Sequence, residues 1–308
     1  MSAGLPSSSW DAEVLARIAW LQLRARELVE GLQQGSHGSI RIAPNVEFAD
    51  YKDYCPGDSL RDLDWRVMAR SDRLVVRRHR AETELSCTLV LDASGDMDTG
   101  DRSDWPRGAR PPLQGTKWGY AAVMAATLAW WLHRQGEPVG LAVVGGEDVR
   151  WRWLPPRKGQ NHMARLMGVI ASCRPHGRAD LGEAFARIGT SLPRRSLVLV
   201  LSDLMEEPSG WTDQLRAMVS RRTDLRMVHI HDPGEWTLDY KDAGRFLSPE
   251  GGDPLVLDPS DVRAHFEAVV EEYKTEVRAA LGSLGIRHHL TPTTDDLGTS
   301  LARVLRGA

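Results

Sequence analysis

The chain has 308 residues, of which 42% are hydrophobic and 26% are charged, and its formal net charge at pH 7 is -3. This composition is typical of a globular protein with one large domain or two smaller ones, and the charge balance does not favour a nucleic-acid partner. No apolar run reaches the roughly 18 to 20 residues that a membrane-spanning helix needs. The three cysteines, at positions 55, 87 and 173, are too dispersed for a CxxC zinc motif or a disulfide framework. We therefore expect a cytoplasmic protein without a membrane span.

Apolar residues recur at helical spacing from Val14 to Leu32, which predicts a first helix over about residues 7–34. The helix has a single apolar stripe, so we expect it to lie on a larger body, although a helix that binds a partner would have the same pattern. A polar, turn-rich segment follows over residues 40–80. Residues 1–84 are therefore predicted to form an N-terminal helix and an irregular or β extension that packs on the main domain, residues 85–308.

From Leu85 onward, strands and helices alternate, which predicts an α/β fold with a doubly wound, mainly parallel sheet. The turn at Gly145-Gly146 makes the strand after it an antiparallel edge strand. The predicted strands cover residues 85–91, 139–144, 149–154, 196–201, 225–231 and 286–290. The predicted helices cover residues 117–135, 160–173, 181–191, 211–221, 262–281 and 295–305.

Oxygen-bearing side chains cluster directly after the buried-type strand 85–91. Asp92, Ser94 and Asp96 alternate there, and Asp203 follows the strand 196–201. In open α/β sheets, ligands bind at the carboxyl ends of the strands. Because carboxylate and hydroxyl oxygens suit Mg²⁺, we predict a magnesium site at these four residues. The alternative is a vestigial loop whose side chains only accept hydrogen bonds from backbone N–H groups.

The spacing at Asp92 resembles the Asp-x-Ser-x-Ser of the metal-ion-dependent adhesion site in von Willebrand factor A domains. Two departures stand out. Asp96 replaces the second Ser, and Ala179 stands where such sites usually have a Thr, with Asp180 as a possible further oxygen donor. In the adhesion mechanism, the cation keeps an open position that an acidic side chain of the partner fills.

A second motif lies in the turn-rich segment, where Pro56-Gly57 is followed by charged residues and a tryptophan. An arginine–carboxylate network that pins this segment to the sheet is one interpretation. A partner-binding surface is the other, because tryptophan and arginine are common in interface hot spots. The motif residues are Asp58, Arg61, Asp64, Trp65 and Arg70.

Together, these motifs resemble the family called domain of unknown function 58. The resemblance is carried by the segment from Tyr54 to Arg70, by Leu89–Ser94, by the His-Asp-Pro-Gly-Glu run at 231–235 and by the ending around Thr293–Leu297. It implies a von Willebrand factor A-like domain with an extra N-terminal part. It also implies a MoxR-type AAA+ ATPase as partner, in chaperone-like maturation or assembly of a client protein.

We therefore predict a non-catalytic protein-binding module that acts with such an ATPase, with a degenerate Mg²⁺-dependent adhesion site as one route of binding. The chain has no Gly-x-x-x-x-Gly-Lys-[Ser/Thr] loop, so it is not itself a P-loop ATPase, and it has no Gly-x-Ser-x-Gly elbow of a serine hydrolase. Two alternatives remain open. One is a metal-independent scaffold with a vestigial site, and the other is a Mg²⁺-dependent hydrolase.

Overall fold

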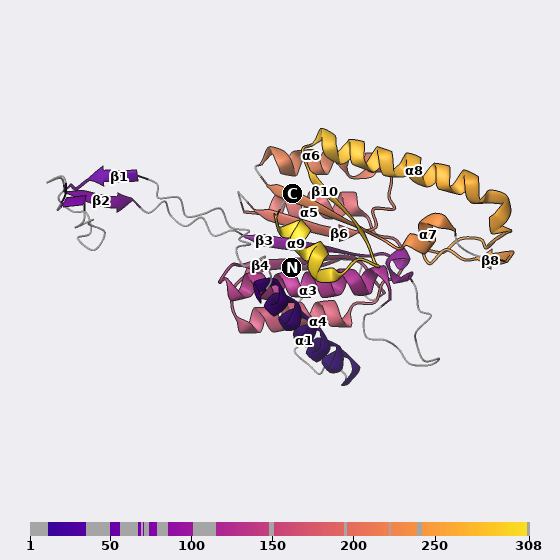
Figure 1. The fold of residues 1–308 in the computed structure, drawn as a ribbon, viewed down its shortest axis with the longest axis horizontal. Helices are drawn as coiled ribbons and strands as arrows, with labels where there is room; N and C mark the ends of the chain where they lie inside the picture. The colour runs from indigo at the N-terminus through magenta and orange to yellow at the C-terminus, as the bar shows by residue number, and fades with distance from the viewer. Residues whose placement is uncertain are drawn as a thin grey trace.

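A six-stranded sheet forms the centre of the computed structural model (Figure 1). The structure describes residues 12–34, 50–55, 67–68, 70, 74–78, 86–100, 115–147, 151–193, 196–221, 223–238 and 242–306. The strand order is β10-β7-β6-β3-β4-β5, and all neighbours are parallel except β5, which is antiparallel to β4. The strands are β3 (Cys87–Ala93), β4 (Val139–Gly145), β5 (Trp151–Arg157), β6 (Leu197–Ser202), β7 (Asp224–His231) and β10 (Arg287–Pro292).

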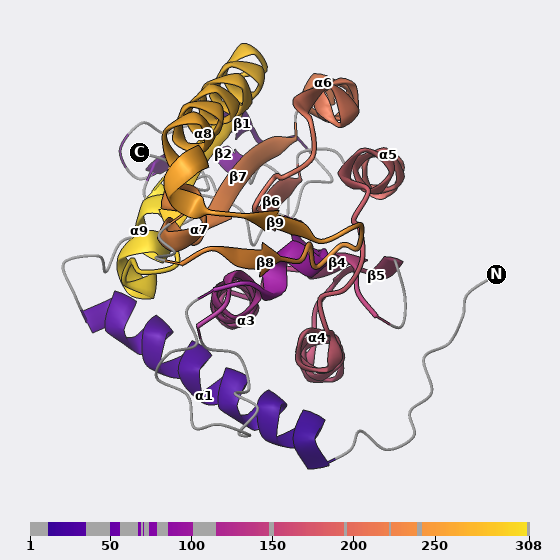
Figure 2. The ribbon, with the colours of Figure 1, turned by 90° about the vertical axis from the view of Figure 1, so that its right-hand side faces the viewer.

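Helices cover both faces of this sheet, as the view toward the carboxyl ends of its parallel strands shows (Figure 2). One face packs against α3 (Lys117–Arg134), α4 (Gln160–Ser172) and α9 (Leu297–Arg306), and α1 (Ala12–Gln34) lies on the outer side of these helices (Figure 2). The other packs against α5 (Leu181–Ser191), α6 (Thr212–Ser220) and α8 (Pro259–Ser283). The predicted doubly wound α/β fold and its antiparallel edge strand are confirmed.

The first helix, α1, lies on the main body, where it packs against α3 and α4. Its apolar stripe is buried, at Leu21, Ala25 and Val29 among others. The Arg17 guanidinium reaches across and donates a hydrogen bond to the backbone oxygen of Ala171 in α4, at 3.3 Å. The apolar stripe of α1 is therefore buried by contacts within this chain.

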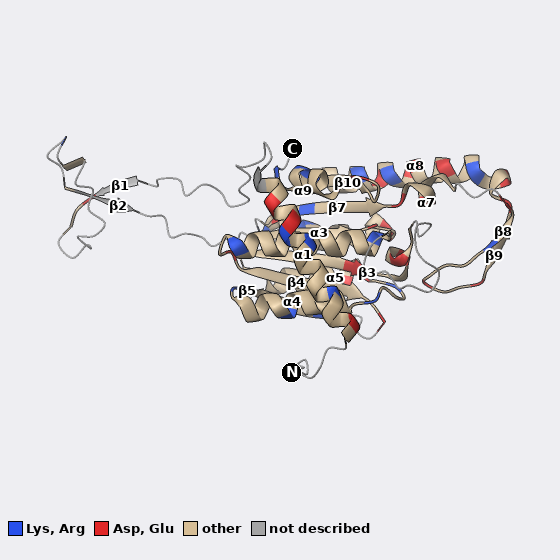
Figure 3. Cartoon of the chain, turned by 60° about the horizontal axis from the view of Figure 1, so that its bottom comes forward, with Lys and Arg blue, Asp and Glu red and all other residues tan. Residues whose placement is uncertain are grey.

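Charged side chains line the outer surface of α8, where acidic and basic residues alternate along the helix (Figure 3). Only Pro259, Val277 and Leu281 of this helix are buried. None of the described helices is long and apolar enough to cross a membrane.

Shorter elements complete the described part of the chain. Two of them form an antiparallel pair, β1 (Asp50–Asp53) with β2 (Val75–Arg78). The others are η2 (Gly95–Asp98), η3 (Pro208–Gly210), α7 (Pro233–Thr237) and a second antiparallel pair, β8 (Gly244–Phe246) with β9 (Leu255–Leu257). The β8–β9 hairpin has no counterpart among the elements predicted from the sequence, and it lies across the carboxyl edge of the main sheet (Figure 2).

Candidate functional site

The predicted metal-binding residues come from two adjacent central strands. Asp92 lies near the carboxyl end of β3, Ser94 follows it, and Asp203 follows β6. Because β3 and β6 are parallel neighbours paired through Leu91 and Leu201, their carboxyl ends meet. The three side chains are buried, with Asp92 and Asp203 each only 3% exposed.

Both carboxylate oxygens of Asp92 already accept hydrogen bonds. Oδ1 accepts from the Ser94 backbone N–H at 2.9 Å, and Oδ2 accepts from the Ser202 hydroxyl at 2.6 Å. The Ser202 oxygen in turn accepts from the backbone N–H of Leu204 at 2.9 Å. Burial, and then the charge of Asp203, raise the pKa of the Asp92 carboxyl well above its ordinary value, against the effect of these hydrogen bonds.

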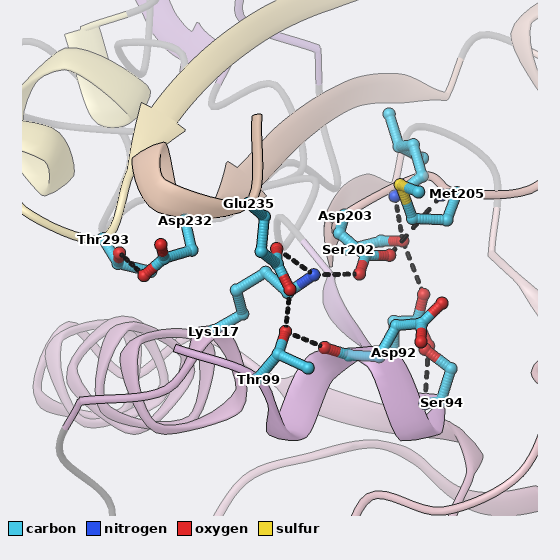
Figure 4. A network of polar contacts seen from close by, with 12 residues as sticks. Asp92, Ser94, Thr99, Lys117, Ser202, Asp203, Met205, Asp232, Glu235 and Thr293 are labelled. Carbon is cyan, nitrogen blue, oxygen red and sulfur yellow. Dashed lines mark hydrogen bonds and ion pairs between the residues drawn. The ribbon is translucent and has the colours of Figure 1, made fainter. Parts of the chain in front are cut away.

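A lysine supplies the positive charge of this site. The Nζ atom of Lys117, at the start of α3, lies 2.8 Å from Asp203 Oδ2 and 2.8 Å from Glu235 Oε2 (Figure 4). Lys117 is only 2% exposed. Burial lowers the pKa of its ammonium, but the two carboxylates outweigh burial and raise that pKa above its ordinary value. The sequence predictions placed neither Lys117 nor Glu235 at the site.

A threonine connects this ion-pair cluster to the loop after β3. The Thr99 hydroxyl lies 2.5 Å from the backbone oxygen of Asp96 and also contacts the Glu235 carboxylate (Figure 4). Asp96 itself is half-buried. Burial and then Asp203 raise the pKa of its carboxyl, while Lys117 opposes the rise. The charges of Asp203 and Lys117 therefore act on the Asp96 carboxyl.

The loop before α5 packs on the same edge without adding a side-chain ligand. The backbone N–H of Gly95 donates to the Gly177 oxygen at 2.7 Å, so this loop supports η2. The side chain of Asp180 accepts from the Glu183 backbone N–H at 2.7 Å. In this arrangement Asp180 caps α5, and its role as a further oxygen donor at the site stays a prediction.

The loop of the β8–β9 hairpin covers the site. A β-carbon on Gly95 would lie 2.6 Å from the backbone oxygen of Pro249, so the two backbones are in close contact. Next to it, Glu250 pairs with Arg178 at 3.2 Å. Burial and then Asp96 raise the pKa of the Glu250 carboxyl, and Arg178 opposes this. A partner's carboxylate that approached Asp92 from this edge would meet the hairpin first.

These residues do not fit a divalent cation in this arrangement. The ammonium of Lys117 already neutralises Asp203, and both oxygens of Asp92 have donors. Among the residues that the structure describes, no group of three or more His, Cys, Asp or Glu side chains is arranged to hold a metal ion. The magnesium site at Asp92, Ser94, Asp96 and Asp203 stays a prediction.

Most of the second motif lies outside the described residues. This holds for Asp58, Arg61, Asp64 and Trp65. Arg70 is described and is exposed. The choice between a structural network and a partner-binding surface therefore stays open for this motif.

Comparison with known proteins places the chain in a family. The family model described as "Protein of unknown function DUF58" matches residues 50–276. The chain belongs to this family. A relative, an uncharacterized protein of Mycobacterium bovis, is 25% identical over 282 residues, which are 89% of this chain and 83% of the relative. The resemblance inferred from the motifs is thus confirmed.

Solved structures with a similar arrangement have low sequence identity. An aerotolerance-related membrane protein from Bacteroides fragilis is 12% identical, with a TM-score of 0.45 over 72% of this chain and 98% of that chain. The von Willebrand factor A domain of SpRpn10 is 15% identical, with a TM-score of 0.40 over 71% of this chain and 94% of that chain.

Proposed function

We propose that this DUF58 protein is a non-catalytic protein-binding module that binds a MoxR-type AAA+ ATPase without a bridging metal ion. The ATPase is the partner that the family resemblance implies, with a client protein as the object of its work. The observation that carries the proposal is the β8–β9 hairpin, which covers the carboxyl edge and exposes apolar side chains. Partner binding is therefore assigned to the hairpin rather than to the buried carboxylates.

The hairpin has the surface character of an interaction site. Leu247, Leu255 and Val256 are 66%, 59% and 75% exposed, all within or next to two strands of three residues. Met205, in the loop after β6, is exposed as well. Exposed apolar side chains gathered within one short hairpin favour a protein–protein contact. By contrast, alternating charges follow the surface of α8 (Figure 3).

The buried cluster supports a metal-independent mode of binding. In the adhesion mechanism a partner's carboxylate reaches an open position on the cation, whereas Asp92, Lys117 and Asp203 are all buried here. The hydrolase alternative needs a divalent cation at the same carboxylates, and the Lys117 ammonium already pairs with one of them, Asp203. The hairpin is accessible without any rearrangement of this cluster.

A binding measurement with matched variants tests the proposal. Val256→Asp would be compared with Val269→Asp, which places the same charge at a 47%-exposed valine on α8. With a purified MoxR-type ATPase from the same genome, we expect Val256→Asp to weaken binding at least about tenfold, a cost of about 1.4 kcal/mol. Val269→Asp should leave the Kd unchanged, and so should EDTA.

Three results would contradict the proposal. They are no association of the wild-type protein with the ATPase, an equal loss of affinity in the two aspartate variants, or loss of binding in EDTA. The last result would instead favour the predicted magnesium site. Circular dichroism of each variant would verify that the fold is intact.

A further inference from the structure

Lys117 occupies an unusual place for a cation. It is the first residue of α3, directly after the cap residue Thr116, whose hydroxyl oxygen accepts from the Gly119 backbone N–H at 3.0 Å. The amino end of a helix favours negative charge, so the helix dipole works against a lysine there. Burial adds a desolvation cost of several kcal/mol for an ammonium. The position therefore needs compensation from elsewhere in the fold.

Part of that compensation comes from a residue that the adhesion motif would assign to a metal site. Asp203, the predicted ligand after β6, directs Oδ2 at the ammonium, and Glu235 of α7 directs Oε2 at it from the other side (Figure 4). We propose that Lys117 is a built-in cation, which takes the place of a divalent metal ion at the carboxyl edge of the sheet.

The distances indicate that a mutation of Lys117 could restore a metal ion to this position. Both carboxylate oxygens lie 2.8 Å from the same nitrogen. Mg²⁺ binds oxygens at about 2.0–2.1 Å, so each carboxylate would need to move by only about 0.7 Å to reach an ion at that point. The carboxyl groups of Asp92 and Asp96 are also nearby, since the charge of Asp203 raises the pKa of both. Removing the ammonium without filling its space should therefore create a divalent cation site.

The experiment is titration of Mn²⁺ into wild-type protein, Lys117→Ala and Lys117→Met, followed by calorimetry and by the electron paramagnetic resonance signal of free Mn²⁺. The alanine leaves room for an ion, whereas the methionine removes the charge but fills the space. We expect Lys117→Ala to bind Mn²⁺ at least about tenfold more tightly than the wild type. Lys117→Met should show no such gain, and adding Asp203→Asn to Lys117→Ala should abolish it.

Thermal unfolding gives a second readout if the alanine variant is unstable. Mn²⁺ should raise the Tm of Lys117→Ala, or restore its cooperative unfolding, and should leave the wild-type Tm unchanged. The inference is overturned if wild-type protein binds Mn²⁺ in a manner that Asp92→Ala or Asp203→Asn abolishes. It is also overturned if Lys117→Ala neither binds Mn²⁺ nor gains stability from it. These readouts involve no ATPase, so their failure is distinct from failure of the hairpin proposal.

Discussion

Two neighbouring regions of the carboxyl edge treat buried titratable groups in opposite ways. At the ends of β3 and β6, Lys117, Asp203 and Glu235 are charged and paired. Near the carboxyl end of β7, His229 and His231 take their place, and burial lowers the pKa of both rings so that they are neutral at pH 7. His229 is fully buried and lies 3.2 Å from His288 through their ring nitrogens.

Aromatic packing, rather than ion pairing, holds the histidine region together. The ring of His231 stacks on Trp236, with centroids 3.8 Å apart and 9° between the planes. Burial and then His288 lower the pKa of His229 to about 3, and burial and then Lys274 lower that of His231 to about 4. The two rings are thus neutral at pH 7.

A single short helix serves both regions. In α7, Glu235 pairs with Lys117, and the next residue, Trp236, packs against His229 and His231. This edge of the sheet therefore tolerates a buried charge only where an opposite charge is within contact distance. Where no such partner exists, the groups give up their charge instead.

The largest expected effect comes from breaking the charged region. Lys117→Met should lower the free energy of unfolding by about 3–5 kcal/mol, because it leaves the buried Asp203 and the half-buried Glu235 without their cation. Urea denaturation would measure this loss. The control is Arg216→Met, which removes an exposed ion pair with Asp213 and should cost no more than about 1 kcal/mol. An equal loss of unfolding free energy in both variants would mean that the buried ion pairs stabilise the fold no more than the exposed pair does.

The pH dependence of stability separates the two regions. Between pH 6.5 and about 4, an unfolded histidine binds a proton while the folded His231 does not, so stability falls as the pH is lowered through this window. Each such histidine contributes a slope of about 1.4 kcal/mol per pH unit. The Asp92 carboxyl changes stability with pH in the opposite direction. Because its pKa is raised, the folded state keeps a proton above pH 3.8 that the unfolded state loses, so the contribution of Asp92 to stability is lost as the pH rises.

Urea denaturation at several pH values would show both signs. His231→Gln should flatten the rise of stability from pH 4 to 6.5, and Asp92→Asn should make that rise steeper. If the two variants changed the slope in the same direction, the histidine and carboxylate regions would not differ as the comparison requires.

The smallest effect is expected from restoring the adhesion pattern. Asp96→Ser recreates Asp-x-Ser-x-Ser, but Lys117 still pairs with Asp203 in this variant. We therefore expect no gain in Mn²⁺ affinity by calorimetry and a change in unfolding free energy within about 0.5 kcal/mol, since the side chain is only half-buried. Mn²⁺ binding by Asp96→Ser alone would show that the motif, rather than the lysine, decides whether a metal binds.

Sequence periodicity was sufficient to predict the main sheet and its helices, because the strands are long and buried and the helices have clear apolar faces. It missed the β8–β9 hairpin, whose strands have only three residues each and whose Leu255 and Val256 face outward. Alternation of apolar and polar residues cannot be recognised over so short a strand.

The candidate site was predicted in part. Strand-end placement found Asp92 and Asp203, since parallel neighbours bring their carboxyl ends together. Lys117 was missed because the motif specifies oxygen ligands and no feature of it names a cation. One signal was present: Lys117 is the only charged residue in an otherwise uncharged run from 115 to 133. A lone lysine at the start of an apolar helix indicates a buried partner for its charge.

The separation of these partners along the chain has a consequence for synthesis. Asp203 follows Lys117 by 86 residues, and the strand that carries it to the site, β6, pairs with β3. At a translation rate of about 5–20 residues per second, Lys117 leaves the ribosome roughly 4–17 s before Asp203 does. During that interval, docking of α3 in its final position would leave the buried Lys117 without its carboxylate partners, so we expect the final docking of this helix to follow the arrival of β6.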